Sequence, residues 1–353
     1  MNILIVKLSA IGDVIHTLPA LNAIRAHYPD AHITWVVEEA AADLVRGHRA
    51  LNRVLVSGRK RWIKALKTPS RWLALREILT FFQELRDTRY DVVLDFQALL
   101  KSAMLIALVR GKRKIGFDKG MQHMEHSYVF LNERIGPVDM EVHALLRNMM
   151  MLKSIGINSG TVAYDLPIQP EHRIAAENLI YGDCREASKP VVAVNPVAKW
   201  DTKLWSNRSF ARMADILVDQ YEAHVVFTGS ADDHDTIGQI RSMMTHRAVN
   251  LAGRTSLMEL AAVYEKADVV VSTDTGPMHL AAAAGTPVVA LFGPTAPWRT
   301  GPYGDGHRVL RADVSCSPCF RRLCPSMQCM KCIGVRQVVG AVAQLLNPDG
   351  VKP

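Results

Sequence analysis

The segment at residues 267–294, ADVVVSTDTGPMHLAAAAGTPVVALFGP, restricts the possible folds more than any other part of the chain. Residues 269–272 are mostly β-branched and apolar without alternation, which is typical of a strand buried on both faces of a parallel sheet. Pro277 suits the first position of a helix, where its missing N–H costs little, and residues 278–284 continue that helix. A glycine then ends the helix, and residues 288–292 form the next buried strand. The segment therefore predicts a strand–turn–helix–strand unit of an open α/β sheet.

The turn of this unit lies at the carboxyl end of a strand, where open α/β sheets bind their ligands. The helix that follows offers free N–H groups and the positive end of its dipole, which suit a phosphate or a diphosphate. Asp274 and His279 lie at the same turn. Thr275 or Gly276 can cap this helix. As an alternative to a functional role, Asp274 only caps the helix and His279 only packs. A second turn of this kind near the amino terminus favours a functional site.

That second turn follows a strand expected at residues 3–7. Residues 9–13, Ser-Ala-Ile-Gly-Asp, form a tight loop, and residues 14–27 carry the apolar periodicity of a helix. The loop holds one glycine, so it is not a dinucleotide-binding fingerprint. Asp13 lies where the strand gives way to the helix, and it is either a helix cap or a functional carboxylate.

Strands and helices alternate along the whole chain and predict two parallel, doubly wound halves. In the first half, strands are expected at residues 33–37, 53–56, 91–96 and 114–117, with helices at 72–86, 96–108 and 141–155. In the second half, strands are expected at residues 191–195, 224–228 and 248–251, with helices at 172–185, 210–221, 235–245 and 257–266. Residues 158–170 lack periodicity and contain two prolines, which indicates a linker. The predicted Rossmann-like domains are residues 1–168 and 169–353.

The composition is that of an ordinary globular protein, with 49% hydrophobic and 22% charged residues. No run approaches the roughly 18 apolar residues of a membrane helix. The amino terminus has neither a basic leader nor a cleavage site of small residues, so we expect no signal peptide and a cytoplasmic location.

The formal net charge of +8 predicts an anionic partner. Basic residues alternate with tryptophans and leucines between residues 59 and 76, and a second basic cluster covers residues 110–114. This mixture suits a membrane surface that bears anionic lipid. Nucleic acid is the competing partner, and a merely solvated loop and helix is the third possibility. The basic residues of the first cluster are Arg59, Lys60, Arg61, Lys64, Lys67, Arg71 and Arg76.

Five of the six cysteines fall within residues 316–332, and the sixth, Cys184, stands apart and is expected in the core. Two Cys-x-x-Cys pairs have the spacing of a zinc knuckle. A structural metal site, a reduced tail that packs its thiols, and redox pairing are the possibilities, and a cytoplasm disfavours the last. A metal here would fasten a loop and would not explain a reaction. The five residues are Cys316, Cys319, Cys324, Cys329 and Cys332.

Five motifs together carry a resemblance to a known family. They are KLSAIGDVIHTLP at residues 7–19, WVVEE at 35–39, DFQALLKSA at 95–103, STDTGPMH at 272–279 and FGPT at 292–295. In these motifs the chain closely resembles the ADP-heptose:lipopolysaccharide heptosyltransferases of glycosyltransferase family 9. Two of the motifs, WVVEE and DFQALLKSA, favour heptosyltransferase I within that family. The resemblance spans nearly the whole chain. It implies an α/β GT-B fold, in which two Rossmann-like, doubly wound parallel-sheet domains face each other across a cleft.

The resemblance implies an inverting transfer of L-glycero-D-manno-heptose from ADP-heptose to 3-deoxy-D-manno-octulosonic acid (Kdo) of the lipid A inner core of lipopolysaccharide. Residues 1–168 would bind the acceptor, and residues 169–353, with the cysteine-rich tail and a C-terminal helix, the ADP-sugar. Asp13 matches the family's base, which takes the proton of the attacking hydroxyl. Lys203 matches a lysine that balances the leaving ADP, so neither a cofactor nor a metal is expected.

The remaining site residues follow from the same resemblance. The family often places a ribose-binding glutamate where this chain has the shorter Asp232 and Asp233, and either of these could serve. Ala98 replaces a glycine that is common in the DFQ segment. The donor-binding residues that match the DTGxxH motif are Asp274, Thr275, Gly276 and His279. The expected acceptor-binding residues are Gly12, Lys101, Arg61 and Lys64.

The expected partners are ADP-heptose, Kdo-lipid A and the inner-leaflet membrane surface, with no nucleic acid. The protein would then be cytoplasmic and peripheral on the inner face of the cytoplasmic membrane. Heptosyltransferase II, or a family member that uses another nucleotide sugar, is the nearest alternative. A basic zinc-knuckle protein that binds nucleic acid is the other, but it leaves both strand-to-helix turns unexplained.

Overall fold

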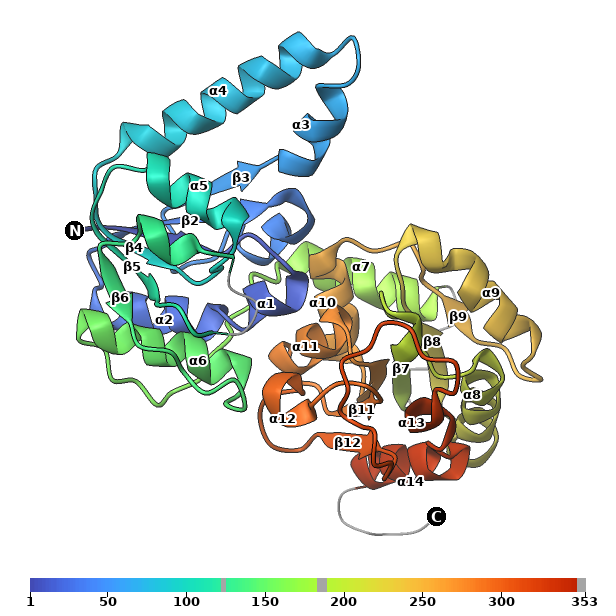
Figure 1. Cartoon of the computed structure of the whole chain (residues 1–353). Helices are drawn as coiled ribbons and strands as arrows, with labels where there is room; N and C mark the ends of the chain where they lie inside the picture. Colours follow the sequence, from blue (N-terminus) through green and yellow to red (C-terminus); the bar gives the residue numbers. More distant parts are fainter. Residues whose placement is uncertain (122–124, 183–188, 348–353) are drawn as a thin grey trace. The chain divides into compact units, whose positions relative to one another are not determined.

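The computed structural model describes residues 1–121, 125–182 and 189–347, so the expectation for Cys184 lies outside the described residues. The chain forms two compact units, Met1–Pro167 and Ile168–Pro353, which are called unit 1 and unit 2 below. Each unit contains a sheet of six parallel strands with helices packed on its faces (Figure 1). Both units are therefore doubly wound α/β structures.

In unit 1 the strand order is β3-β2-β1-β4-β5-β6. The order reverses between β1 and β4, so the carboxyl ends of these two strands form the topological switch point at which such sheets bind ligands. The strands are β1 (Asn2–Val6), β2 (His32–Glu38), β3 (Arg53–Ser57), β4 (Tyr90–Asp95), β5 (Gly111–Phe117) and β6 (Glu133–Ile135). The α-helices are α1 (Ile11–Ile15), α2 (Leu18–His27), α3 (Arg59–Ala65), α4 (Arg71–Asp87), α5 (Leu100–Leu108) and α6 (Ala144–Met151).

Unit 2 repeats this topology with the order β12-β11-β10-β7-β8-β9, and its switch point lies between β7 and β10. The strands are β7 (Val191–Asn195), β8 (His224–Phe227), β9 (Val249–Asn250), β10 (Val269–Thr273), β11 (Val288–Phe292) and β12 (Arg308–Arg311). The longer helices are α7 (Pro170–Tyr181), α8 (Asn207–Tyr221), α9 (His234–Ser242), α10 (Leu257–Lys266), α11 (Gly276–Ala283) and α14 (Val335–Leu346). The short helices are α12 (Pro297–Thr300) and α13 (Gln328–Lys331).

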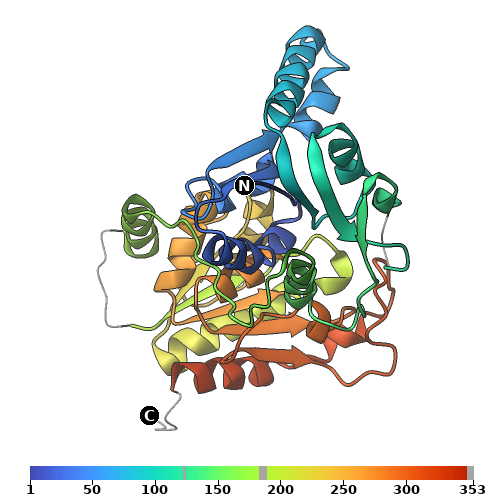
Figure 2. The same ribbon diagram turned by 90° about the vertical axis from the view of Figure 1, so that its left-hand side faces the viewer.

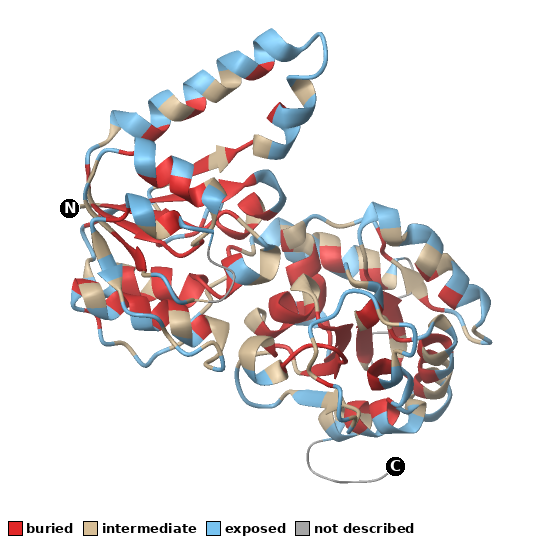
Figure 3. Ribbon diagram, in the orientation of Figure 1, coloured by how far each residue is buried: buried red, intermediate tan, exposed pale blue. Residues whose placement is uncertain are grey.

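The central strands are buried along nearly their whole length, as Figure 3 shows in red. All residues of β7, β10 and β11 are buried. Helices cover both faces of a parallel sheet, which requires strands that are apolar throughout instead of alternating. This requirement is the reason that the unalternated runs in the sequence predicted these strands correctly.

The helix expected at residues 14–27 is instead two helices, α1 and α2. Pro19 falls in the first turn of α2, where it has no N–H to donate to a helix that would continue from α1. The break is held by side chains, because Thr17 Oγ1 donates to the carbonyl of Asp13 at 2.8 Å and Asn148 Nδ2 donates to the carbonyl of His16 at 3.0 Å. As a result, Asp13 belongs to a helix of a single turn.

Other differences concern the ends and edges of elements. The helix expected at residues 141–155 is the shorter α6 followed by a 3-10 turn, and the one expected at 172–185 ends at Tyr181 within the described residues. The edge strands β6 and β12 were not predicted, because they are short and carry charged residues. Among the described residues, no helix has the length and apolar character that crossing a membrane requires.

Candidate active site

Asp13 lies at the carboxyl end of β1, on the first turn of α1. Its carboxylate accepts a hydrogen bond from the N–H of Ala10 at 3.0 Å, and the side chain is exposed. The N–H of Ala10 is one of the donors that a helix start leaves without an intrahelical partner. The two interpretations of Asp13 are therefore compatible, because the carboxylate closes the turn while it stays open to a ligand.

A cavity of about 320 Å³ opens beside Asp13. Its walls come from the segments that follow β1 and β4 at the switch point of unit 1, and from α6. The polar residues that line it, besides Asp13, are Lys7, His16, Gln97, Arg147 and Asn148. The cavity thus joins one exposed carboxylate with two cationic side chains, which suits an acidic ligand that carries a hydroxyl.

Lys7 is the buried cation of this cavity, and sequence reasoning assigned it no role. Its Nζ donates to the carbonyl of Phe96 at 2.8 Å. Burial lowers the pKa of Lys7, and the charges of Asp13 and Asp95 act in the opposite direction. A lysine at the end of an otherwise apolar buried strand was the signal that could have identified it.

The loop before Asp13 is fixed by residues that follow β4. Gln97 Oε1 accepts the N–H groups of Leu8 at 2.8 Å and Ser9 at 3.0 Å. The buried carboxylate of Asp95 accepts the N–H groups of Gln97 and Ala98 at 3.0 and 3.1 Å, and burial raises the pKa of Asp95. Ala98 adopts a φ of 55°. Glycine takes this left-handed conformation at less cost, which gives a physical reason for the glycine that the family often has there.

The expected acceptor residues divide into two groups. Lys101 reaches the Asp13 loop, because its Nζ contacts Ser9 Oγ and lies 3.3 Å from Glu38 Oε1, and burial lowers the pKa of Lys101. Gly12 is the second residue of α1. Arg61 and Lys64 are on α3 and do not line the cavity beside Asp13.

Arg61 is already engaged within unit 1. Its guanidinium pairs with Glu39 at 2.9 Å and with Glu77 at 2.6 Å, and these carboxylates raise its pKa. Lys64 is exposed on the same helix. An acceptor group that binds Arg61 would have to compete with two carboxylates.

In unit 2, Asp274 follows β10 and forms a nearly buried ion pair with Lys203. Lys203 Nζ lies 2.6 Å from Asp274 Oδ2 and also donates to the main-chain carbonyl of Asp274 at 3.2 Å. Thr295 Oγ1 donates to the same carboxylate oxygen at 2.6 Å. The alternative in which Asp274 only caps the helix is therefore wrong, since its carboxylate is bound by a cation and a hydroxyl from two other loops.

The contact between Lys203 and Asp274 follows from the strand order at the switch point of unit 2. Lys203 lies on the loop that follows β7, and Asp274 on the turn that follows β10. The two strands pair side by side, with Asn195 opposite Ser272, so the segments after them emerge together. Lys203 Nζ also lies 4.7 Å from the centre of the Trp200 ring, which adds a cation–π contact.

The start of α11 has the form expected of a diphosphate site. Thr275 is the N-cap residue in an extended conformation, its side chain makes no capping hydrogen bond, and the helix begins at Gly276. Pro277 is the second helical residue, not the first as expected, and it supplies no donor. The main-chain N–H groups of Thr275 and Gly276 are therefore the natural donors at this helix start. His279 lies buried one turn further along α11.

The two candidate ribose-binding carboxylates differ in their surroundings. Asp233 is tied to Ser230, whose N–H and Oγ–H donate to its carboxylate at 2.8 and 2.5 Å. Asp232 is exposed on the same turn. The loop after β9 approaches this turn closely at Gly253, which has a φ of 71° and would place a Cβ 2.8 Å from the Cα of Ala231.

The cysteine-rich segment packs onto both loops that hold the Asp274 carboxylate. The N–H groups of Cys319 and Phe320 donate to the carbonyl of Pro294 at 2.9 and 2.8 Å, next to Thr295. Thr202 Oγ1 donates to the carbonyl of Arg321 at 2.9 Å, next to Lys203. All five cysteines of the segment are free thiols, and the part of the chain that the structure describes contains no group of three or more His, Cys, Asp or Glu side chains able to hold a metal.

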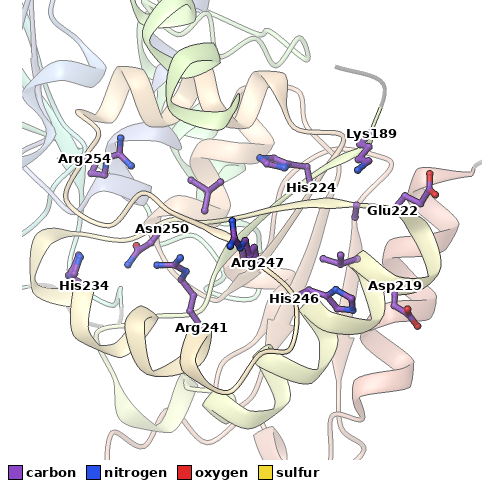
Figure 4. A pocket seen from close by; sticks show the side chains of 14 residues that line it. Lys189, Asp219, Glu222, His224, His234, Arg241, His246, Arg247, Asn250 and Arg254 are labelled. Atoms are coloured by element: carbon purple, nitrogen blue, oxygen red, sulfur yellow. The ribbon is translucent and has the colours of Figure 1, made fainter. Parts of the chain in front are cut away.

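A cavity of about 1110 Å³ in unit 2 lies along the edge strand β9 (Figure 4). Three arginines and three histidines line it, but none of the predicted donor residues does. Asp219 and Glu222 lie together at one end of it in Figure 4. This cavity is larger than the one beside Asp13, but it does not coincide with the Lys203–Asp274 site. The arginines are Arg241, Arg247 and Arg254, and the histidines are His224, His234 and His246.

Known proteins resemble this chain over both units. The sequence model of the family described as glycosyltransferase family 9 (heptosyltransferase) matches residues 78–330. The chain is 32% identical to lipopolysaccharide heptosyltransferase 1 of Pseudomonas aeruginosa, over 99% of this chain and 96% of that protein. It is 30% identical to lipopolysaccharide heptosyltransferase 1 of Escherichia coli strain K12, over 88% of this chain and 94% of that protein. The solved structure of E. coli heptosyltransferase WaaC with ADP-2-deoxy-2-fluoro heptose has a TM-score of 0.74 and 27% identity, and the match covers 99% of this chain and 100% of that one.

Proposed function

The chain belongs to glycosyltransferase family 9, the heptosyltransferases, and on this basis we propose that it transfers L-glycero-D-manno-heptose from ADP-heptose to Kdo of the lipid A inner core. Its two six-stranded parallel sheets are those of the GT-B fold. The observation that carries the proposal is the exposed carboxylate of Asp13 beside a cavity that also contains Lys7 and Arg147. The nucleic-acid-binding alternative is not favoured, because the relatives that match nearly the full chain are heptosyltransferases.

Asp13 is the proposed base of an inverting displacement. Its carboxylate takes the proton of the acceptor hydroxyl, while the acceptor oxygen forms a bond to the anomeric carbon of heptose. The bond between that carbon and the diphosphate oxygen breaks on the opposite face, and ADP leaves with the electron pair. The single displacement inverts the anomeric configuration.

The donor diphosphate belongs, in this proposal, at the start of α11. The N–H groups of Thr275 and Gly276 and the positive end of the helix dipole stabilise the negative charge that grows on the leaving diphosphate. Lys203 adds a full positive charge. Asp274 holds the lysine ammonium at this turn, and Thr295 donates to the Asp274 carboxylate, so Asp274 acts as a positioning residue.

The acceptor of this reaction carries a carboxylate, because Kdo is an acidic sugar. Lys7 and Arg147 bring two basic side chains to the cavity beside Asp13, and we expect them to bind the carboxylate of the acceptor sugar. Kdo-lipid A is also a lipid, so an enzyme that acts on it must work at a membrane surface. We therefore propose that the protein is cytoplasmic and peripheral on the inner face of the cytoplasmic membrane.

The test is a transfer assay with purified protein and ADP-heptose. Kdo-lipid A and a core that already bears one heptose are offered as separate acceptors, and the product is identified by mass spectrometry and by NMR of the new anomeric centre. We expect transfer to Kdo-lipid A with inversion. Transfer to the heptosylated core alone would reject the proposed acceptor in favour of heptosyltransferase II, and transfer from another nucleotide sugar alone would reject the donor.

A further inference from the structure

A groove on unit 1 between α3, α4 and α5 has no role in the mechanism above. It encloses about 630 Å³, and most of the residues that line it are apolar. Its floor is the core of unit 1, because Leu8, Trp62, Phe81 and Leu105 are all buried and belong to one hydrophobic cluster. Its walls are apolar side chains left in water: Ile63, Leu66, Leu100 and Met104.

The groove continues along α4 as a second apolar stripe. Ala74, Phe81 and Leu85 form the stripe that packs on the core. Trp72, Leu75, Leu79 and Phe82 follow at helical spacing on the neighbouring face. Trp72 is 71% exposed and Leu79 is 62% exposed, which is unusual for side chains of this size on one face of a helix.

The α3–α4 hairpin projects away from the sheet of unit 1 in both views (Figure 1, Figure 2). Its tip consists of the end of α3, residues 66–70 and the first turn of α4. Between residues 59 and 76 there are seven basic residues and no acidic one. Pale blue along the outer face of α4 in Figure 3 marks the exposed part of this surface.

We propose that this groove binds an acyl chain of an anionic membrane lipid and that the hairpin tip, with Trp72 and Leu73, enters the bilayer surface. The inference rests on the lipid-linked acceptor and the membrane partner of the proposed function. Exposed tryptophan and leucine among lysines and arginines match both parts of such a lipid, its chain and its negative headgroup. Arg59 and Lys101 also line the groove, but both pair with Glu38, at 3.1 and 3.3 Å, and Glu125 adds a carboxylate to the lining. The positive charge for the headgroup therefore comes from the basic residues of the hairpin tip.

The position of the groove supports this occupant. Leu99 lines both the groove and the cavity beside Asp13. A lipid held in the groove would therefore keep the membrane surface close to the cavity where the acceptor sugar reacts.

The first experiment measures binding to vesicles of phosphatidylglycerol and phosphatidylcholine, with phosphatidylcholine alone as the neutral comparison. The double variant Trp72→Ala/Leu73→Ala should bind the anionic vesicles at least about tenfold more weakly than wild type, since two large apolar side chains no longer leave water. Leu323→Ala, a change at a side chain of unit 2 that is 84% exposed, is the matched control and should bind like wild type. Unchanged binding by the double variant would overturn the proposal.

The second experiment locates the acyl chain. Vesicles whose acyl chains carry bromine should quench the fluorescence of Trp62 at the groove floor in the variant Trp72→Phe, and the quenching should disappear in Trp62→Phe/Trp72→Phe. Met104→Glu should also abolish it by placing a charge in the groove, whereas Leu108→Glu, on the same helix outside the groove, should not. Vesicle binding without quenching of Trp62 would overturn the acyl-chain site. A dimer that dissociates in the Trp72 variants would assign the surface to a second copy of the chain and would overturn it too.

A transfer assay on a water-soluble, deacylated acceptor separates this inference from the proposed function. The tip variants should keep the wild-type kcat and KM there, because none of the changed residues lines the cavity beside Asp13. Vesicle binding by a wild-type protein that transfers no heptose would reject the proposed function and leave the lipid site standing.

Discussion

The two strand-to-helix turns that carry Asp13 and Asp274 follow different strands of the same sheet topology. Asp13 follows the first strand of unit 1, and Asp274 follows the fourth strand of unit 2. Both strands border the switch point of their sheet, so each turn receives side chains from the loop after the neighbouring strand. In unit 1 that loop supplies Gln97, and in unit 2 it supplies Lys203.

The two carboxylates differ because of what these neighbours bring. Asp13 is exposed and accepts a main-chain N–H from Ala10. Asp274 is buried between Lys203 and Thr295. A carboxylate that water can reach is able to take a proton from a ligand, whereas one bound to an ammonium and a hydroxyl can only hold them in place. The comparison teaches that the loop beside a strand-to-helix turn decides whether the carboxylate of that turn stays open to a ligand or is bound within the protein.

The largest effect should come from Asp13→Asn. The amide keeps the hydrogen bond from Ala10 but accepts no proton, so kcat should fall by about 10³-fold, within the range for loss of a general base. ADP-heptose affinity, measured by calorimetry, should not change. Asp43→Asn, at an exposed carboxylate of unit 1, is the control and should keep wild-type kcat. Near-normal turnover by Asp13→Asn would show that the two carboxylates do not differ in the way described.

The next effect should come from the ion pair of unit 2. Lys203→Met leaves the Asp274 carboxylate buried without its cation, which should destabilise unit 2 by about 3 kcal/mol in urea unfolding. In the proposed mechanism Lys203 also balances the leaving ADP, so kcat should fall by about 10²-fold, the scale of losing one transition-state donor. Lys203→Met/Asp274→Leu should recover stability but not activity.

A surface ion pair of the same unit provides the contrast. Arg173 pairs with Glu265 at 2.6 Å, and both side chains are partly exposed. Arg173→Ala should cost less than about 1 kcal/mol and leave transfer unchanged. Equal losses from Arg173→Ala and Lys203→Met would remove the argument that burial sets the role of Asp274.

Thr295→Val should have a smaller effect than Lys203→Met. It removes one hydrogen bond to a charged acceptor, which should cost about 2 kcal/mol of stability and should raise the donor KM through a less well held Lys203. Thr295→Ser keeps the hydroxyl and should restore both quantities. A donor KM that does not move in Thr295→Val would mean that the lysine needs no such support.

The smallest effect concerns pH and a histidine in each unit. His48 Nδ1 accepts the N–H of Ala50 at 3.1 Å, and His307 Nδ1 accepts the N–H of Val288 at 3.2 Å. Burial lowers the pKa of His48 and of His307. With a folded pKa below the unfolded one, each histidine contributes stability that is present above about pH 6.5 and is lost as the pH falls through the folded pKa.

Stability should therefore decline in acid with a slope of at most about 1.4 kcal/mol per pH unit for each histidine. His48→Asn should flatten the decline of unit 1, and the exposed His32→Asn should not. The measurement is urea unfolding between about pH 5 and 8, a range that includes the ordinary histidine pKa of about 6.5. A decline that persists in His48→Asn would assign the acid sensitivity of unit 1 to another group.

The sequence by itself determined the two α/β halves and the strand-to-helix turns on which Asp13 and Asp274 lie. Buried parallel strands require unbroken apolar runs, and a turn between such a strand and a helix is visible within about 30 residues. It failed at the break between α1 and α2, where Pro19 acts against the apolar periodicity of a longer helix, and at the edge strands β6 and β12. Lys203 was named through the family resemblance, because a lone loop lysine carries no local signal.

Only the tertiary structure decided which groups meet. Lys203 and Asp274 are 71 residues apart, and Lys7 and Phe96 are 89 apart, yet each pair is in contact. These contacts follow from strand order, which brings β7 beside β10 and β1 beside β4. Strand order is set by the burial of whole sheets under their helices, and no short stretch of residues encodes it. The tertiary structure also set the surroundings of the two carboxylates. It leaves that of Asp13 exposed to water and buries that of Asp274 against a lysine.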